Sequence, residues 1–103
     1  MKNILLSADG EIGVFCVPDH VAENLEKYCL EFSCHWLHES PDAAKYRLKR
    51  GNGIVVCYNE KDFIAYLNQY VCDETSALVT TLANVFHVED VPEEYCGLPY
   101  FNF

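Results

Sequence analysis

The longest stretch of this chain with a single hydrophobic period runs from residue 18 to residue 38. Apolar side chains recur there at the spacing of one helix face, with polar side chains between them. The apolar positions are Val21, Leu25, Tyr28, Cys29, Phe32 and Trp36. Asp19 can cap the free amide groups of the first turn, and Ser40-Pro41 ends the pattern because the residue before a proline avoids the α region. The sequence therefore predicts a helix over residues 19–38.

Shorter apolar runs predict strands. Residues 3–6 and 12–17 flank a polar turn and predict an N-terminal β-hairpin. Gly13, inside the second run, indicates a bulge or a close backbone approach. A glycine-rich turn at residues 51–53 precedes a continuous apolar run at residues 54–58, which predicts a strand covered on both faces.

The remaining segments carry local helix and turn signals. Ser40 is the expected cap of a short second helix, and Asn59 is the expected cap of a helix over residues 60–72, supported by Asp62 in its first turn. Residues 77–84 are ambiguous, because their spacing suits a helical turn while their β-branched side chains favour a strand. The preferred interpretation is a short helix followed by a strand at residues 85–88. One helical turn is expected at residues 92–95, and the aromatic tail at residues 100–103 is expected to be packed.

These elements predict one α+β domain over residues 1–103. Its small, mainly antiparallel sheet is expected to contain the N-terminal hairpin and a strand near residues 54–58. The long helix over 19–38 and the helix over 60–72 are expected to pack on this sheet.

Composition narrows the class of protein. Half of the residues are hydrophobic, which excludes a disordered tail. The net charge of −9 disfavours direct binding of nucleic acid, because an acidic protein repels phosphates. The same charge could also serve only to keep the protein soluble. Six cysteines without a Cys-x-x-Cys pair indicate reduced thiols. No signal peptide and no apolar run of membrane-spanning length is apparent, so a cytoplasmic location in a bacterial host cell is expected.

No motif predicts catalysis or a cofactor. Cys34 and His38 share a helix face and are good zinc ligands, but no second pair has matching spacing, and a buried cysteine beside partly exposed histidines is the preferred interpretation. A cysteine nucleophile paired with a histidine is not indicated, because no cysteine lies in a recognisable strand-turn-helix or glycine-rich motif. The glycines at 51–53 fall far short of a phosphate-binding loop. We therefore expect no enzyme activity, no metal, no cofactor and no small-molecule ligand.

The charges are unevenly distributed along the chain. Residues 45–50 hold four of the seven basic side chains, while six of the sixteen acids form three adjacent pairs. The pairs are Asp73-Glu74, Glu89-Asp90 and Glu93-Glu94. Carboxylates accept the same bidentate hydrogen bonds from arginine as phosphates do, so such acids could occupy a basic groove meant for nucleic acid. The alternative is a solvated acidic rim without a partner.

Three runs carry a resemblance to a known family. They are residues 17–29 with Trp36, residues 62–68, and residues 92–103 with their Pro-Tyr-Phe-Asn-Phe ending. These runs resemble a family of small acidic proteins of gut Firmicutes and their mobile elements. The family includes a metagenome-derived anti-CRISPR protein that acts on type II-A nucleases. The resemblance implies a non-enzymatic inhibitor that binds a type II CRISPR effector nuclease and blocks DNA engagement or cleavage.

The family supplies no functional residues that can be transferred, so the candidate partner-binding residues come from charge and expected exposure. They are Asp73, Glu74, Glu89, Asp90, Glu93, Glu94, Tyr95, Tyr100 and Phe101. The aromatic members are included because aromatic side chains are enriched at interface hot spots. Three alternatives stay open: a regulatory or interaction module of a mobile element with another protein partner, a metal-dependent or thiol enzyme, and a weak contact of residues 45–50 with RNA.

Overall fold

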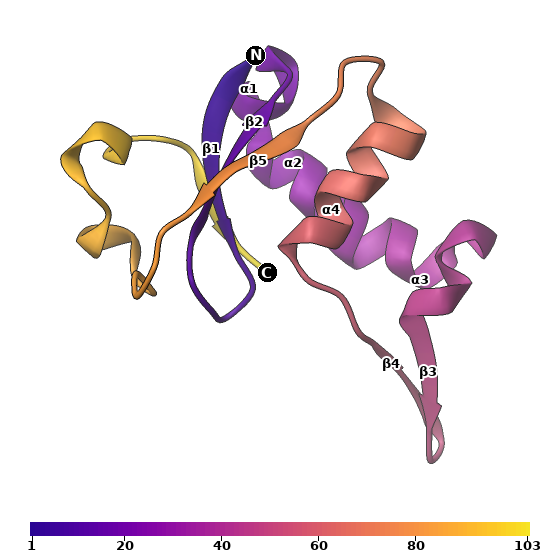
Figure 1. The fold of residues 1–103 in the computed structure, drawn as a ribbon. Coiled ribbons are helices and arrows are strands. Elements are labelled where there is room, and N and C mark those ends of the chain that lie inside the picture. The colour runs from indigo at the N-terminus through magenta and orange to yellow at the C-terminus, as the bar shows by residue number, and fades with distance from the viewer.

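The computed structural model describes residues 1–103 and confirms the α+β class. A mixed four-stranded sheet, a separate two-stranded hairpin and two helical segments of 15 and 12 residues make up the fold (Figure 1). The strands are β1 (Lys2–Ser7), β2 (Gly13–Val17), β3 (Arg47–Arg50), β4 (Gly53–Val56), β5 (Ala77–Thr81) and β6 (Tyr100–Asn102). None of the helices combines the length and the apolar character needed to cross a membrane.

The four strands of the main sheet lie in the order β5-β2-β1-β6. β1 and β2 form the predicted antiparallel hairpin, β5 pairs antiparallel with β2, and β6 runs parallel to β1. The bulge predicted at Gly13 is confirmed in its neighbourhood, because the β2–β5 register shifts between Val14 and Phe15. A Cβ atom on Gly13 would lie 2.8 Å from the Phe15 ring, which accounts for a glycine at this position.

β1 separates two hydrophobic cores. Ile4 and Leu6 belong to the main core, whereas Leu5 belongs to a second, smaller core, because alternate side chains of a strand point to opposite faces. The helices cover the first face of the sheet, and residues 82–98 cover the second (Figure 1). The continuous apolar run of β1 therefore belongs to a central strand that is buried on both sides.

The predicted long helix is present but not continuous. It comprises α1 (Asp19–Glu23), α2 (Leu25–Leu30), a π-helical stretch η1 (Glu31–Trp36) and α3 (Leu37–Glu39). Asn24 leaves the helical conformation with φ −131° and ψ 39°, and its side-chain amide donates to the carbonyl of His20. The 15-residue part after Asn24 places Phe32 at the centre of the main core. Phe32 contacts the rings of Trp36, Tyr58, Phe63, Tyr66 and Phe103.

The caps predicted at Ser40 and Asn59 are confirmed, but the cap predicted at Asp19 is wrong, because Pro18 holds the N-cap position without a side-chain hydrogen bond and Asp19 binds the Met1 amine instead. The side chain of Asn59 accepts from the amides of Lys61 and Asp62, and Asp62 accepts in return from the amide of Asn59, which completes a capping box. The helix that follows comprises α4 (Glu60–Tyr66) and the π-helical η3 (Leu67–Val71). Ser40 caps the 3-10 helix η2 (Pro41–Tyr46) by accepting from the amide of Asp42.

Two expectations about strands are also wrong. The strand predicted at 54–58 exists as β4 (Gly53–Val56), but it pairs with β3 outside the main sheet, and only Val56 at its end packs against the main core, whereas Ile54 is 66% exposed. The segment 77–88 is not a helix followed by a strand. Its first part is the strand β5, since β2 offers it a backbone partner and β-branched side chains suit a strand. Its last residue, Val88, begins the 3-10 helix η4 (Val88–Asp90).

Candidate functional site

We call residues 82–99 the acidic lobe, the segment that leaves β5 and covers the outer face of the sheet (Figure 1). Leu82 and Val91 are buried in the second core and hold the lobe against the sheet. Backbone hydrogen bonds fix its start, because the amide of Ile12 donates to the carbonyl of Val85 and the amide of Leu82 donates to the carbonyl of Ile12. The lobe also contains the predicted helical turn, η5 (Glu93–Tyr95).

The acidic lobe brings together four of the six predicted acids. Glu89, Asp90, Glu93 and Glu94 are all exposed on its two 3-10 turns, and the lobe contains no lysine or arginine. The two salt bridges of the protein lie elsewhere, between the Met1 amine and Asp19 and between Lys2 and Glu23. The four carboxylates therefore have no basic partner within the protein. Asp73 and Glu74 are exposed in the loop between η3 and β5 and do not join them.

The three predicted aromatic anchors are engaged within the fold. Tyr95 and Tyr100 are half-buried and pack against the second core, while Phe101 is half-buried against the main core. The Phe101 ring lies 4.9 Å from that of Phe103. β6 thus sends alternate rings to opposite faces of the sheet, and only part of each ring is open to a partner.

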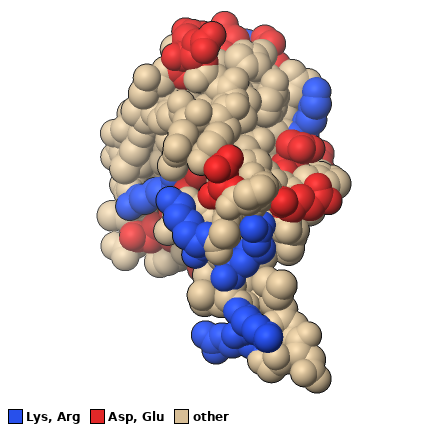
Figure 2. Space-filling view, turned by 90° about the vertical axis from the view of Figure 1, so that its right-hand side faces the viewer, with Lys and Arg blue, Asp and Glu red and all other residues tan.

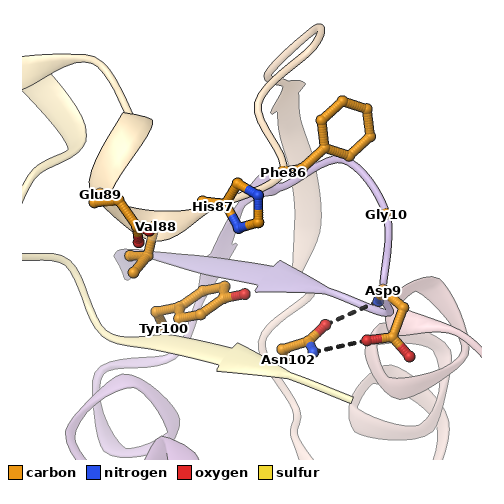
Figure 3. Close-up of a pocket in the computed structure, with 8 residues that line it drawn as sticks. All are labelled: Asp9, Gly10, Phe86, His87, Val88, Glu89, Tyr100 and Asn102. Carbon is orange, nitrogen blue, oxygen red and sulfur yellow. Dashed lines mark hydrogen bonds between the residues drawn. The ribbon is translucent and has the colours of Figure 1, made fainter.

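A cavity of about 400 Å³ opens beside the acidic lobe (Figure 3). Three segments that are distant in sequence line it: the β1–β2 loop, the start of the lobe and β6. The lining residues are Asp9, Gly10, Phe86, His87, Val88, Glu89, Tyr100 and Asn102. Sequence reasoning named only Glu89 and Tyr100 among them. It missed the others because only the folded sheet brings the loop and the last strand together.

A hydrogen-bond network sets the position of Asp9 at the rim of this cavity (Figure 3). The backbone amide of Asp9 donates to Oδ1 of Asn102 at 2.9 Å, and Nδ2 of Asn102 donates to Oδ1 of Asp9 at 3.0 Å. The hydroxyl of Ser7 also donates to Oδ1 of Asn102, at 2.8 Å, and lies 2.9 Å from the hydroxyl of Tyr100. Asp9 has φ 57°, a conformation that aspartate tolerates better than most residues. Its Oδ2 atom accepts no hydrogen bond from the protein and is free for a ligand.

The cavity suits a cation carried on an organic side chain. The carboxylates of Asp9 and Glu89 can accept hydrogen bonds from a guanidinium or an ammonium group. The ring of Tyr100 in the lining can make a cation–π contact, which arginine makes more readily than lysine, whereas the Phe86 ring points away from the other lining residues (Figure 3). An arginine side chain of a partner protein is thus a good chemical match.

The candidate zinc ligands lie on the surface of the long helix. No group of three or more histidine, cysteine, aspartate or glutamate side chains is placed to hold a metal ion. Cys34 and His38 are both exposed on the helix over residues 25–39, so the expectation of a buried cysteine at position 34 is wrong. Cys34 lies beside the hydroxyl of Ser33, 3.8 Å away, rather than beside a third ligand.

Comparison of the chain with protein-family models, with curated proteins and with solved structures gives no match. What the protein does must be inferred from its own residues and from the resemblance noted in its sequence.

Proposed function

We propose that this protein is a non-enzymatic inhibitor that binds a type II CRISPR effector nuclease and blocks DNA engagement or cleavage. The observation that carries the proposal is the gathering of four unpaired carboxylates on one lobe, beside a cavity suited to arginine. The sequence resemblance supplies the class of partner. The charges supply the mode of contact, because a nuclease that binds DNA must present basic side chains to the phosphates.

The acidic lobe can imitate part of a nucleic acid backbone. Carboxylates and phosphates both take bidentate hydrogen bonds from arginine, so four carboxylates on one lobe offer an arginine-rich groove a similar pattern of acceptors. Asp9 and Glu89 would hold one arginine inside the cavity, while Asp90, Glu93 and Glu94 would meet its neighbours at the rim. Opposite charges also steer the encounter, which raises the rate of association at low salt.

The direct test is DNA cleavage by a purified type II-A CRISPR nuclease loaded with guide RNA, with this protein titrated in. Inhibition that is complete near one equivalent would support the proposal. Cleavage that stays intact at large excess with several such nucleases would refute the choice of partner.

A pair of matched variants tests the surface. Glu93→Lys/Glu94→Lys reverses two acids of the lobe, and Glu26→Lys/Glu31→Lys makes the same change in net charge at exposed helix positions. Reversing two contact charges should weaken inhibition by roughly tenfold, at about 0.7 kcal/mol for each charge, while the helix variant should inhibit like the parent protein. Equal losses in both variants would show that net charge, and not the lobe, matters.

Salt dependence tests the mechanism separately from the partner. A complex held by the lobe should dissociate as the ionic strength rises, because exposed charges are screened beyond a Debye length of about 8 Å at physiological salt. A complex that forms equally well at high salt would count against acidic mimicry, even if the nuclease were inhibited.

A second candidate function is an interaction module of a mobile element that binds a protein other than a nuclease. The specific observation behind it is β5, which lies at the edge of the main sheet and exposes Leu78 and Val79. An open edge with apolar side chains can accept a strand from a partner. Leu78→Lys/Val79→Lys would abolish binding of this kind and leave inhibition through the acidic lobe intact.

A further inference from the structure

The β3–β4 hairpin is the most basic part of an acidic protein. We call residues 45–56 the basic hairpin, which projects beyond the helices at one end of the molecule (Figure 1). It holds four of the seven lysines and arginines and no acid, so the rest of the chain carries three bases against sixteen acids, or −13. Figure 2 shows lysine and arginine side chains gathered on the projecting part, with the acids on the body above.

The strand register places cations on both faces of the hairpin. Lys49 pairs with Ile54, and Arg50 pairs with Gly53. Residues that pair directly share a face of the ribbon, and neighbours along a strand lie on opposite faces, so Lys49 and Arg50 point to opposite sides. Both side chains are exposed. Three apolar side chains beside them are also exposed: Leu48, Ile54 and Val55. Exposed apolar side chains that adjoin one another often mark a binding surface.

The base of the hairpin is fixed to the body. The guanidinium of Arg47 donates to the carbonyls of Leu37 at 2.9 Å and Ser40 at 2.8 Å, at the end of the long helix. The amide of Cys57 donates to the carbonyl of Tyr46 at 2.9 Å and continues the ladder. Arg47 is therefore occupied in holding the hairpin. The exposed cations that remain are Lys49 and Arg50 near the turn and Lys45 at the base, whose ammonium lies 5.1 Å over the Tyr46 ring.

The acids of the body do not cancel the field at the tip. A strand of four residues extends about 13 Å at 3.3 Å per residue, which exceeds the Debye length of about 8 Å at physiological salt. For a polyanion at the tip, the attraction to the nearby cations is therefore stronger than the repulsion from the net charge of −9. The repulsion that the composition predicts for nucleic acid is an average over the molecule and does not apply to this end.

We propose that the basic hairpin binds duplex DNA by lying in the major groove. A two-stranded β-ribbon fits the width of that groove, and phosphates line both of its sides, which matches cations on both faces of the ribbon. The turn at residues 51–53 has two glycines and one asparagine, so its backbone can approach the base edges closely. The exposed Ile54, which adjoins this turn, can contact a thymine methyl group.

Other polyanions fit this arrangement less well. The major groove of duplex RNA is deep and narrow and does not admit a ribbon, so binding to duplex RNA should be weaker. An acidic protein surface would meet one face of the hairpin and leave the cation on the other face unpaired. Duplex DNA therefore satisfies more of the exposed groups than either alternative.

The test is fluorescence anisotropy of labelled duplex DNA with the purified protein, which needs no nuclease and is independent of the proposed inhibition. Three phosphate contacts give a slope of about −2.7 in a plot of log affinity against log salt, so affinity should fall about 40-fold between roughly 50 and 200 mM salt. Lys49→Glu/Arg50→Glu should abolish binding. Lys27→Glu/Lys61→Glu changes the net charge equally outside the hairpin and should keep most of the affinity.

Several outcomes would overturn the proposal. One is the absence of DNA binding by the parent protein at low salt and at protein concentrations up to about 10⁻⁴ M, the weak end of non-specific binding. A second is an equal loss of affinity in the two double variants, whose folding is checked by circular dichroism. A third is binding of duplex RNA or poly-L-glutamate as tight as that of duplex DNA, because the ribbon would then recognise negative charge alone.

Discussion

Replacing Phe32 with alanine is the sharpest test of how the main core is built. Phe32 is fully buried, and its ring centroid lies within 6 Å of five other aromatic rings, the nearest being Tyr66 at 5.1 Å. These partners come from the long helix, from the segment before α4, from α4 itself and from the end of the chain. The substitution therefore leaves a cavity at the point where all of these elements meet.

The expected cost follows from this burial. A buried phenylalanine replaced by alanine loses about 3–5 kcal/mol through lost transfer energy and the cavity that remains. The upper half of that range applies here, because edge-to-face and stacked aromatic pairs add about 0.5–1.5 kcal/mol each beyond their buried area. A domain of 103 residues has a total stability of about 5–15 kcal/mol. The variant should therefore be only marginally folded, with Tm lowered by roughly 16–20 °C at about 4 °C per kcal/mol.

The assay is urea denaturation followed by circular dichroism, with Phe86→Ala as the matched control. Phe86 is 52% exposed, so the same change of side chain there should cost less than about 0.5 kcal/mol. If Phe32→Ala lost less than about 1 kcal/mol with an unchanged m-value, the aromatic cluster would not be the centre of the core, and this reasoning would fail.

Three further predictions test other parts of the fold. Asn59→Ala removes the capping box of α4 and should lower the free energy of unfolding by about 1 kcal/mol in urea denaturation, whereas a change near zero would mean that the cap is redundant. Burial raises the pKa of the Tyr66 hydroxyl, so its contribution to stability is complete below the ordinary pKa of about 10 and is lost as pH rises through the folded pKa. Tyr66→Phe should make stability fall less steeply above that pH, and an identical slope would contradict the assignment. Burial likewise raises the pKa of the Cys29 thiol, so Cys29 should react with Ellman's reagent only after the protein unfolds. The exposed cysteines should react at once in the folded protein; they are Cys34, Cys57 and Cys96.

The features that could be predicted from the sequence are those decided within a few residues. Ser40, Asn59 and Asp62 act on amides two or three positions away, so their caps appear in the sequence as they do in the structure. The turn at Gly51, which has φ 57°, is equally local. Hydrophobic period likewise located the two helical segments and the first hairpin.

Features that depend on a distant partner could not be predicted. Residues 77–81 become a strand because β2 offers them a free edge, and no pattern inside the segment reveals that edge. The apolar run at 54–58 looks buried, yet its exposure depends on what lies beside it in space. The candidate site also depends on distant partners, because Asp9 and Asn102 form a hydrogen bond although they lie 93 positions apart in the sequence. Of the residues that line the cavity, the sequence indicated only Glu89 and Tyr100 as candidates.

The parallel pairing of β6 with β1 has a consequence for how the protein is made. Leu5 pairs with Tyr100, and the amide of Phe103 donates to the carbonyl of Ser7. One edge of β1 can therefore form its backbone hydrogen bonds only after residues 100–103 have been made. Closing a loop of this length carries an entropic cost of about 4 kcal/mol, which is recovered only when the last strand has docked. On the ribosome, β1 must therefore remain without one neighbour until residues 100–103 have left the exit tunnel. A chaperone that shields Leu5 and Leu6 during that interval should raise the yield of folded protein.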